Sequence, residues 1–399
     1  MTYKKAKQKL LLERIAMAPF VWLGKCAGHL FPLKTPHSYF LFFPNADIGG
    51  SPKVNADITA LLSNKQPLVI FSKKANNNQY LHQYQQSAVT IIDLHKYIDR
   101  KLFHFVNFFF RGLLATWINQ QKNPIVFGGE SIFFYKVIPH VRKNIRCVEL
   151  THVDVWMKYT IGFIDRIDAR IFSTRKGMQN VLDQYEQNNL GESYKEKLHF
   201  IDNAVDIPET TEQQNKELEV FFIGRGAAQK RIHLVAAIAE QMHQLQAPVH
   251  FNFVGDVEKI IDPGTLPYCR FYGIVNDEET MQALYKKADV LILTSAFEGL
   301  PVVIMQMMAY GKVVLSTAVS GIPDYIFHQK NGLLIYATEE KDIIKEAVAH
   351  INFLVNEPEV RKQLGAVAKQ DALCQFSRES FNENYMAVLD PTVKSRTAS

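Results

Sequence analysis

The chain has 399 residues, which are too many for a single hydrophobic core and suit two domains of fewer than about 200 residues each. Hydrophobic residues make up 47%, which excludes extensive disorder, and the mild net charge of +5 does not suggest nucleic-acid binding. The sequence contains no phosphate-binding Walker loop and no His-Glu-x-x-His zinc motif. Its widely spaced cysteines indicate free thiols in a reducing, cytoplasmic compartment: Cys26, Cys147, Cys269 and Cys374.

The N-terminal segment, residues 1–35, is basic and then apolar. Its cations precede the apolar run 15–23 and are Lys4, Lys5, Lys7, Lys9 and Arg14. Glu13 and Pro19 argue against a signal peptide, and the run is too short to span a bilayer. Two alternatives stay open. One is an amphipathic helix on an anionic membrane, where each cation contributes on the order of 1 kcal/mol. The other is a helix packed on the first domain.

The first predicted domain, residues 36–205, has the rhythm of a doubly wound fold. A strand at 39–43 leads into Gly49 and Gly50 and then into a helix that ends near Leu62. Further strands are predicted at 68–72, 88–93, 124–127, 146–150 and 169–173.

A helix predicted at 100–122 has an unusually wide apolar face. Its polar stripe consists of Arg100, His104, Asn107, Arg111, Asn119 and Lys122, and aromatic and aliphatic residues fill the rest. Such a face indicates a helix buried on most sides or one that dips into lipid. The regular charged stripe argues against a transmembrane span, and burial against the sheet is favoured.

A polar linker at 206–217 precedes the second predicted domain, residues 218–370. Its first strand, 218–223, is followed by Gly-Arg-Gly, but the third glycine of a dinucleotide fingerprint is absent. Arg225 and Lys230 instead suggest a diphosphate site in which two fixed cations neutralise a leaving group. Strands follow at 249–254 and 270–272, then a helix at 277–287. A tail helix at about 358–386 is expected to cross back onto the first domain, within a crossover segment 371–390.

The stretch 289–316 reads as strand, loop, helix and strand. Pro301 suits the first helical position, and Gly311 suits the left-handed residue after the last turn. Glu298 and Gly299 therefore lie at the carboxyl end of a strand and over a helix N-terminus, where α/β sheets bind ligands. Gln306 lies eight residues beyond Glu298, about 12 Å along if the run is helical.

This stretch resembles the signature of retaining glycosyltransferase family 4. The resemblance rests on Ser295, Glu298-Gly299-Leu300-Pro301, Ala309, Gly311 and Val313-Val314. It implies a GT-B fold, with two doubly wound Rossmann-like domains facing a cleft and a C-terminal helix that returns to the N-terminal domain. It also implies that Glu298 binds hydroxyls of the donor sugar and that Gln306, where the family has glutamate, binds the ribose. Glutamine can bond two hydroxyls but lacks a carboxylate's charge.

The resemblance also implies roles for residues elsewhere in the chain. His152 would position the donor sugar, and Arg225 and Lys230 would hold the diphosphate. The remaining donor-binding candidates lie in loops that follow strands or, for Gln306, in the helix: Gly49, Gly50, Gly255, Ile274, Val275, Gly299, Leu300, Pro301 and Gln306.

The expected function is a metal-independent, retaining, hexosyltransferase-type glycosyltransferase of cell-envelope polysaccharide synthesis. Its donor would be a UDP-, GDP- or ADP-linked sugar, and its acceptor a glycan or a lipid-linked molecule. No cofactor, metal or nucleic acid is expected, and the enzyme would be cytoplasmic, peripheral on the inner face of the plasma membrane. Two alternatives remain. One is a decayed nucleotide-sugar-binding protein, suggested by Gln306, Asp324 and Ala204. The other is a GT-B epimerase or soluble sugar-phosphate synthase.

Overall fold

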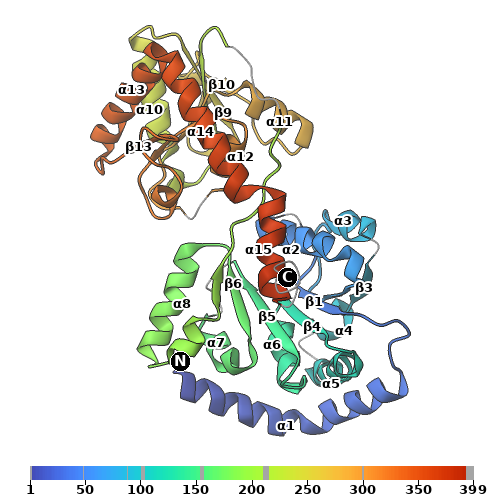
Figure 1. Cartoon of the computed structure of the whole chain (residues 1–399). Coiled ribbons are helices and arrows are strands. Elements are labelled where there is room, and N and C mark those ends of the chain that lie inside the picture. Colours follow the sequence, from blue (N-terminus) through green and yellow to red (C-terminus); the bar gives the residue numbers. More distant parts are fainter. Residues whose placement is uncertain are drawn as a thin grey trace, which may run out of the picture. The chain divides into compact units, whose positions relative to one another are not determined.

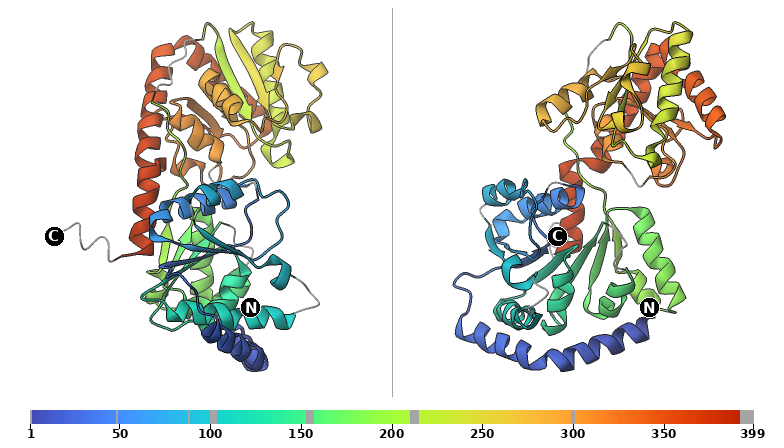
Figure 2. Two further views of the ribbon diagram at one scale, coloured as in Figure 1. Left: turned by 90° about the vertical axis from the view of Figure 1, so that its right-hand side faces the viewer. Right: turned by 180° about the vertical axis from the view of Figure 1, so that it is seen from behind.

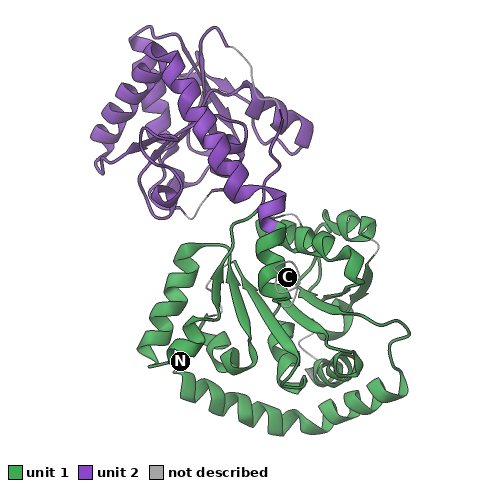
Figure 3. Cartoon of the chain, in the orientation of Figure 1, with its two compact units in different colours: residues 1–203, 382–399 green, residues 204–381 purple. Residues whose placement is uncertain are grey.

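The paired strands that the computed structural model describes are all parallel and form two sheets, one in each of two units (Figures 1 and 3). Unit 1 comprises residues 1–203 and 382–399, and unit 2 comprises residues 204–381. The structure describes residues 2–47, 49–87, 89–99, 104–152, 157–209, 215–298 and 301–391.

The sheet of unit 1 has the strand order β3-β2-β1-β4-β5-β6-β7. Its strands are β1 (Tyr39–Phe43), β2 (Leu68–Phe71), β3 (Thr90–Asp93), β4 (Ile125–Gly129), β5 (Arg146–Thr151), β6 (Ala169–Phe172) and β7 (Leu198–Phe200). Every residue of β1 is buried, because a central parallel strand is covered by helices on both faces. The order reverses between β1 and β4, which makes the carboxyl ends of these strands the switch point of the sheet.

The helices of unit 1 are α1 (Tyr3–Leu30), α2 (Gly50–Leu61), α3 (Leu81–Gln86), α4 (His95–Ile98), α5 (His104–Gln120), α6 (Ile132–Val137), α7 (Met157–Thr160), α8 (Arg175–Gln187) and α9 (Glu192–Lys195). Two short 3₁₀ turns, Ile138–His140 and Ile161–Arg166, follow α6 and α7.

The helix α5 is buried from two sides, which accounts for its wide apolar face. Leu114 and Ile118 pack into a core cluster with Phe42 and Val126 of the sheet. On its other side α5 is covered along its length by α1 (Figures 1 and 2). The expectation that this helix is buried is therefore confirmed for the described residues 104–120.

Glycines set the close approach of α1 to α5. A Cβ atom at Gly24 would lie 1.9 Å from the Phe109 carbonyl oxygen, and one at Gly112 would lie 2.0 Å from the Val21 carbonyl oxygen. At Gly28 it would lie 2.7 Å from Thr116 Cβ. The N-terminal segment is thus a helix packed on the first unit, but its outer face stays exposed. Within the described chain, no helix is both long and apolar enough to cross a membrane.

The sheet of unit 2 has the order β10-β9-β8-β11-β12-β13, with its switch point between β8 and β11. Its strands are β8 (Leu218–Ile223), β9 (Val249–Val254), β10 (Arg270–Phe271), β11 (Val290–Leu293), β12 (Val313–Thr317) and β13 (Leu333–Ile335). Its helices are α10 (Ile232–Gln244), α11 (Glu278–Lys287), α12 (Val302–Ala309), α13 (Glu340–Asn356) and α14 (Pro358–Phe376).

The tail helix is not continuous, so the prediction of a single helix is wrong. α14 ends at Phe376, Ser377 is extended, and α15 (Arg378–Leu389) begins anew. The Ser377 hydroxyl accepts a hydrogen bond from the Ser380 N–H at 3.1 Å, so it caps the new helix. The chain passes to unit 1 within α15, where Arg146 donates to the Val388 carbonyl at 2.7 Å.

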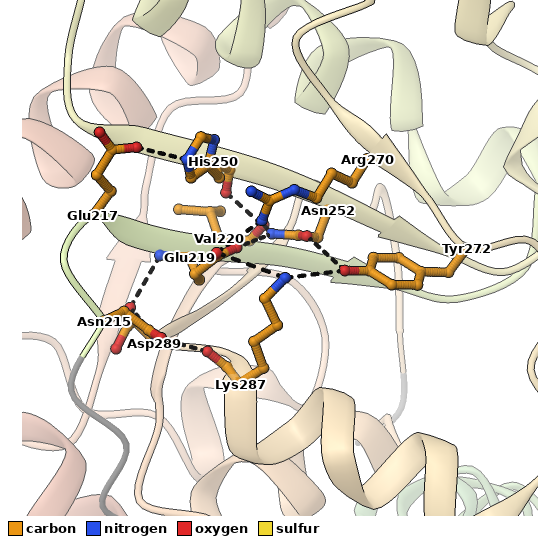
Figure 4. A network of polar contacts seen from close by, with 10 residues as sticks. All are labelled: Asn215, Glu217, Glu219, Val220, His250, Asn252, Arg270, Tyr272, Lys287 and Asp289. Atoms are coloured by element: carbon orange, nitrogen blue, oxygen red, sulfur yellow. Dashed lines mark hydrogen bonds and ion pairs between the residues drawn. The ribbon is translucent and has the colours of Figure 1, made fainter.

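A polar network ties the strands of unit 2 together at their amino ends (Figure 4). The buried Glu219 carboxylate accepts from Arg270 Nη1 at 2.8 Å and from Asn252 Nδ2 at 2.7 Å. The Asp289 carboxylate accepts from the Glu219 N–H at 3.0 Å. These contacts link β8, β9, β10 and the start of β11, and the opposite, carboxyl ends of the strands hold the candidate site.

Candidate functional site

The loops after β8 and β11 meet at the switch point of the unit 2 sheet. Lys230 follows β8 and Glu298 follows β11, and their side chains form an ion pair there. Both side chains are largely buried, with 14% and 8% of their surface exposed. Ser295 Oγ also donates to the same carboxylate oxygen of Glu298 at 2.7 Å. A fixed cation and a fixed carboxylate therefore lie together where an open α/β sheet binds ligands.

Arg231, to which the sequence assigned no role, holds these two loops in register. Its backbone is left-handed, with φ of 45°, and this turn separates the 3₁₀ turn Ala228–Lys230 from α10. Its guanidinium donates to the carbonyl oxygens of Thr294 at 2.7 Å and Ser295 at 3.0 Å. Gln229 Nε2 adds a bond to the Phe297 carbonyl at 2.8 Å. Arg231 therefore positions Lys230 and Glu298.

The loop after β9 lies against the loop after β8 through glycines. Gly255 has φ of +123°, and a Cβ atom there would lie 1.8 Å from the Gly224 carbonyl oxygen. The Gly226 N–H donates to Asp256 Oδ1 at 2.7 Å. Two hydrogen bonds lower the pKa of Asp256 to about 2: the larger effect comes from the Lys259 ammonium and the smaller from this N–H. Gly255 thus allows the backbones of these two loops to approach closely, and its donor-binding role stays a prediction.

The other unit 2 candidates lie in the loops after β8 and β10 and in α12. Arg225 is exposed, and its guanidinium makes no hydrogen bond or ion pair with the described residues. Ile274 is exposed and Val275 half-buried, in the loop after β10. Gln306 is half-buried in α12. The positions Gly299 and Leu300 lie outside the described residues.

Pro301 is the N-cap residue of α12, so its predicted place as the first helical residue is wrong. Its φ of −62° suits a helix, but its ψ of 132° is extended, and the helix begins at Val302. At the other end Gly311 has φ of +67°, as predicted for the residue after the last turn.

His152 lies in unit 1, directly after β5. Its backbone N–H donates to Glu130 Oε1 at 3.1 Å, and its Nδ1 lies 2.9 Å from Ser173 Oγ. Its Nε2 is buried and has no hydrogen-bond partner among the described residues. Burial lowers the pKa of His152 to about 4, so the imidazole is neutral at pH 7.

A buried polar network beneath His152 was missed from the sequence. Arg170 on β6 donates to Glu149 on β5 at 2.6 Å and to the Tyr185 hydroxyl at 2.8 Å. Tyr135 donates to the same Glu149 carboxylate, and Thr151 Oγ1 donates to it at 3.1 Å. The available signal was a charged residue in the interior of each of two adjacent, mostly apolar strands, because such charges are buried only when they are paired.

Gly49 and Gly50 begin α2 at the switch point of the unit 1 sheet, Gly49 as the N-cap residue. The structure thus groups the predicted residues by unit: His152, Gly49 and Gly50 in unit 1, and the other described candidates in unit 2. In the described part of the chain, no group of three His, Cys, Asp or Glu side chains is placed to hold a metal ion. The roles of all these residues stay predictions.

Residues 205–371 match the family model of the glycosyl transferases group 1. The matched segment contains the Lys230–Glu298 pair and the loops around it. Unit 2 is a group 1 glycosyltransferase domain. The resemblance noted in the sequence is thereby confirmed at the level of group 1 glycosyltransferases.

Curated relatives resemble parts of the chain. The Staphylococcus aureus poly(ribitol-phosphate) alpha-N-acetylglucosaminyltransferase is 25% identical over 236 residues, which cover 57% of this chain and 45% of that protein. A Campylobacter jejuni alpha-1,4-N-acetyl-D-galactosaminyltransferase, named for its GalNAc-GalNAc-diNAcBac-PP-undecaprenol substrate, is 32% identical over 162 residues. That alignment covers 39% of this chain and 43% of the relative. The chain therefore spans less than half the length of each of these two relatives.

Solved structures show the fold of the whole chain. The Anabaena protein HepE, solved in complex with UDP and glucose, superposes with a TM-score of 0.63 and covers 90% of this chain and 100% of its own, at 15% identity. The chain forms two parallel, Rossmann-like sheets, one after the other. Together with this likeness they establish the predicted GT-B fold.

Proposed function

We propose that the protein is a retaining glycosyltransferase that moves a sugar from a nucleotide-diphosphate sugar to a glycan or lipid-linked acceptor in cell-envelope polysaccharide synthesis. The ion pair between Lys230 and Glu298 at the switch point carries this proposal. A bound sugar diphosphate offers phosphate oxygens to Lys230 and sugar hydroxyls to Glu298. Lys230 and Glu298 then each bind a group of the donor in place of each other. Arg225, whose guanidinium makes no hydrogen bond or ion pair with the described residues, supplies a second cation for the diphosphate.

In the proposed reaction the bond between the sugar C1 and the diphosphate oxygen breaks while the acceptor oxygen bonds to C1 from the same face. The acceptor proton passes to the departing diphosphate oxygen. Arg225 and Lys230 stabilise the negative charge that develops on the diphosphate. The neutral His152 Nε2 is a hydrogen-bonding group for a sugar hydroxyl, and Gln306 for the ribose.

The relatives support the chemistry of both substrates. The names of two relatives specify transfer of N-acetylated hexosamines, to poly(ribitol phosphate) and to a diphospho-undecaprenol-linked glycan. The HepE structure holds UDP and glucose. By analogy, we propose that this chain uses a UDP-, GDP- or ADP-linked hexose as donor and a cell-envelope molecule as acceptor. We also propose that the reaction needs no metal.

The outer face of α1 supports a peripheral place on the inner face of the plasma membrane. Large apolar side chains are exposed along it, including Leu12 at 68% and Trp22 at 64%. Exposed cations that make no ion pair with the described residues lie at its amino-terminal half: Lys4, Lys5, Lys9 and Arg14. Apolar side chains beside cations suit an anionic lipid surface.

Thermal unfolding with nucleotides tests the donor assignment. UDP, GDP, ADP and CMP and their common sugars are added to the full chain, with and without EDTA. A ligand at a hundred times its Kd adds about 2.7 kcal/mol to the free energy of unfolding. We expect one nucleoside diphosphate to raise the Tm equally in EDTA. If none raises the Tm, the site does not bind these nucleotides and the donor assignment is rejected.

A further inference from the structure

A cavity that opens to solvent lies in unit 1, between α1, α4, α5, α6 and the chain after β2. It contains about 1070 Å³ of empty space, including solvent at its mouth. Its lining combines cationic, polar and apolar side chains: Met17, Ser72, Lys73, Ile98, Asp99, Asn107, Phe108, Arg111, Ile132, Phe133 and Lys136. The proposed donor chemistry uses none of these residues.

Arg111 is the unusual member of this lining, because its charge is buried without a carboxylate partner. Its residue surface is only 7% exposed. Its Nε donates to Asn107 Oδ1 at 2.9 Å and its Nη1 to the weak acceptor Met17 Sδ at 3.0 Å. A guanidinium has five N–H donors, and burying its charge is costly unless an anion pairs with it. Among the described residues no carboxylate forms an ion pair with Arg111, although the Glu13 carboxylate, which pairs with Lys136, acts on its charge from a greater distance. Arg111 is therefore suited to receive an anion from a ligand.

The other charges of the lining leave the cavity positive. Lys136 is matched by Glu13, with Nζ and Oε2 3.2 Å apart. Asp99 is exposed, and its carboxylate accepts from the Lys74 N–H at 3.2 Å. Lys73 is exposed at the cavity and makes no ion pair with described residues. Arg111 and Lys73 are thus the lining cations without an ion pair among the described residues, and with Asp99 counted the site keeps a net positive charge for an anionic group.

The aromatic part of the wall continues to the exposed face of α1. Phe108 lines the cavity and stacks on the Arg111 guanidinium, whose Cζ lies 4.7 Å from the ring centre. Phe20 of α1, 40% exposed, lies with its ring centre 6.2 Å from that of Phe108 and 6.1 Å from that of Phe105. A ligand with an alkyl chain can therefore lie along these aromatic rings while its anionic end reaches Arg111.

We propose that this cavity binds the phosphate end of a lipid, with Arg111 and Lys73 on the phosphate oxygens and Met17, Phe108 and Phe133 against the first part of the chain. Arg111 can bind two phosphate oxygens through its planar fork. The identification of this ligand as the lipid phosphate of the acceptor rests on the proposed glycosyl transfer. The binding of a lipid phosphate to the cavity does not depend on that proposal. The cavity would then take its ligand from the same membrane surface that α1 faces.

Calorimetric titration of the full chain with dodecyl phosphate, below its micelle concentration, tests this. We expect binding at one molecule per chain, at least about tenfold tighter than inorganic phosphate, and no binding of the uncharged dodecyl glucoside. Arg111→Gln should abolish dodecyl phosphate binding, because the buried cation is lost. Lys73→Ala should weaken binding about fivefold to tenfold, as expected for one charge-assisted contact.

Lys74→Ala is the matched control, since Lys74 is the exposed neighbour of Lys73 but does not line the cavity. Loss of binding in Lys74→Ala equal to that in Lys73→Ala would overturn the proposal. Equal affinity for inorganic and dodecyl phosphate would overturn it as well, because the apolar wall would have no part. The Tm increase with a nucleoside diphosphate, measured on each variant, reports that the chain is folded. Dodecyl phosphate binding without any nucleotide effect would support the cavity and reject the proposed transferase function.

Discussion

Lys230 and Glu298 are 68 positions apart in the chain, yet each is the other's charged partner. In the proposed reaction the donor would therefore replace one strong contact with another. Such binding would favour a transition state in which the diphosphate gains charge, because Lys230 would then interact more strongly with the diphosphate than with Glu298.

Replacing this lysine tests the role of the pair. Lys230→Ala is expected to lower turnover at least about a hundredfold, as loss of a charge stabiliser does. The measurement is sugar transfer, or donor hydrolysis where the acceptor is not known, alongside Tm to confirm folding. Lys341→Ala, an exposed lysine of α13, is the control. Near-normal turnover in Lys230→Ala would refute the assignment.

His152 should make stability depend on pH. Its pKa is lowered by burial from 6.5 to about 4, so the unfolded chain binds more protons between these values. The stability that it contributes is present above about pH 6.5 and is lost as the pH falls towards 4, on the order of 3 kcal/mol in total.

The comparison of Tm at pH 7 and pH 4.5 isolates this effect. Between pH 7 and pH 4.5 the Tm of His152→Gln should decrease less than that of the unchanged protein. The Tm of His233→Gln, which replaces an exposed histidine, should decrease as much as that of the unchanged protein. His140, whose pKa burial also lowers to about 4, contributes equally to all three proteins and cancels in the comparison. Equal decreases in all three would contradict the burial of a neutral His152.

Among the elements, the pair α1 and α5 shows most clearly how packing decided what the sequence left open. The apolar excess of 100–122 suited either lipid or burial. The backbones approach closely because Gly24, Gly28 and Gly112 carry no side chain at the contact. The four-residue spacing of Gly24 and Gly28 was the available sign of a close helix contact. The sequence does not identify the helix that packs against these glycines, because that contact is tertiary.

Substitution at this contact should separate the helices. Gly24→Ala places a Cβ atom 1.9 Å from a backbone oxygen of α5, which cannot move without shifting the helix. We expect the free energy of unfolding to fall by about 1–3 kcal/mol, measured by urea denaturation. Gly191→Ala is the matched control, since nothing lies within 4 Å of a Cβ atom there. A Gly24→Ala protein as stable as the control would show that α1 is loosely attached.

At the scale of the whole molecule, α1 joins the fold of unit 1 to its proposed membrane surface. Removing the first 34 residues would uncover the α5 face that α1 buries, so deletion cannot separate folding from lipid binding. Point substitutions on the outer face are the appropriate test.

Flotation with liposomes measures this. The full chain should float with vesicles containing phosphatidylglycerol and much less with pure phosphatidylcholine, and salt should weaken the binding. Leu12→Ser with Trp22→Ser should lower the floated fraction severalfold. The exposed Leu245 of unit 2, changed to Ser, is the control. Flotation unchanged by the double substitution would place any membrane contact elsewhere.

The sequence by itself determined the doubly wound class and most strand positions, because fully buried parallel strands are continuous apolar runs that end at glycines and polar loops. It also indicated Arg225, Lys230 and Glu298, since cations and carboxylates after such strands lie at one edge of a sheet. Only the tertiary structure decided which partners these charges take. The Lys230–Glu298 pair, the Arg231 contacts, the Glu149–Arg170 network and the unmatched Arg111 all depend on residues distant in sequence. Their energies come from burial and distance, which no local pattern encodes.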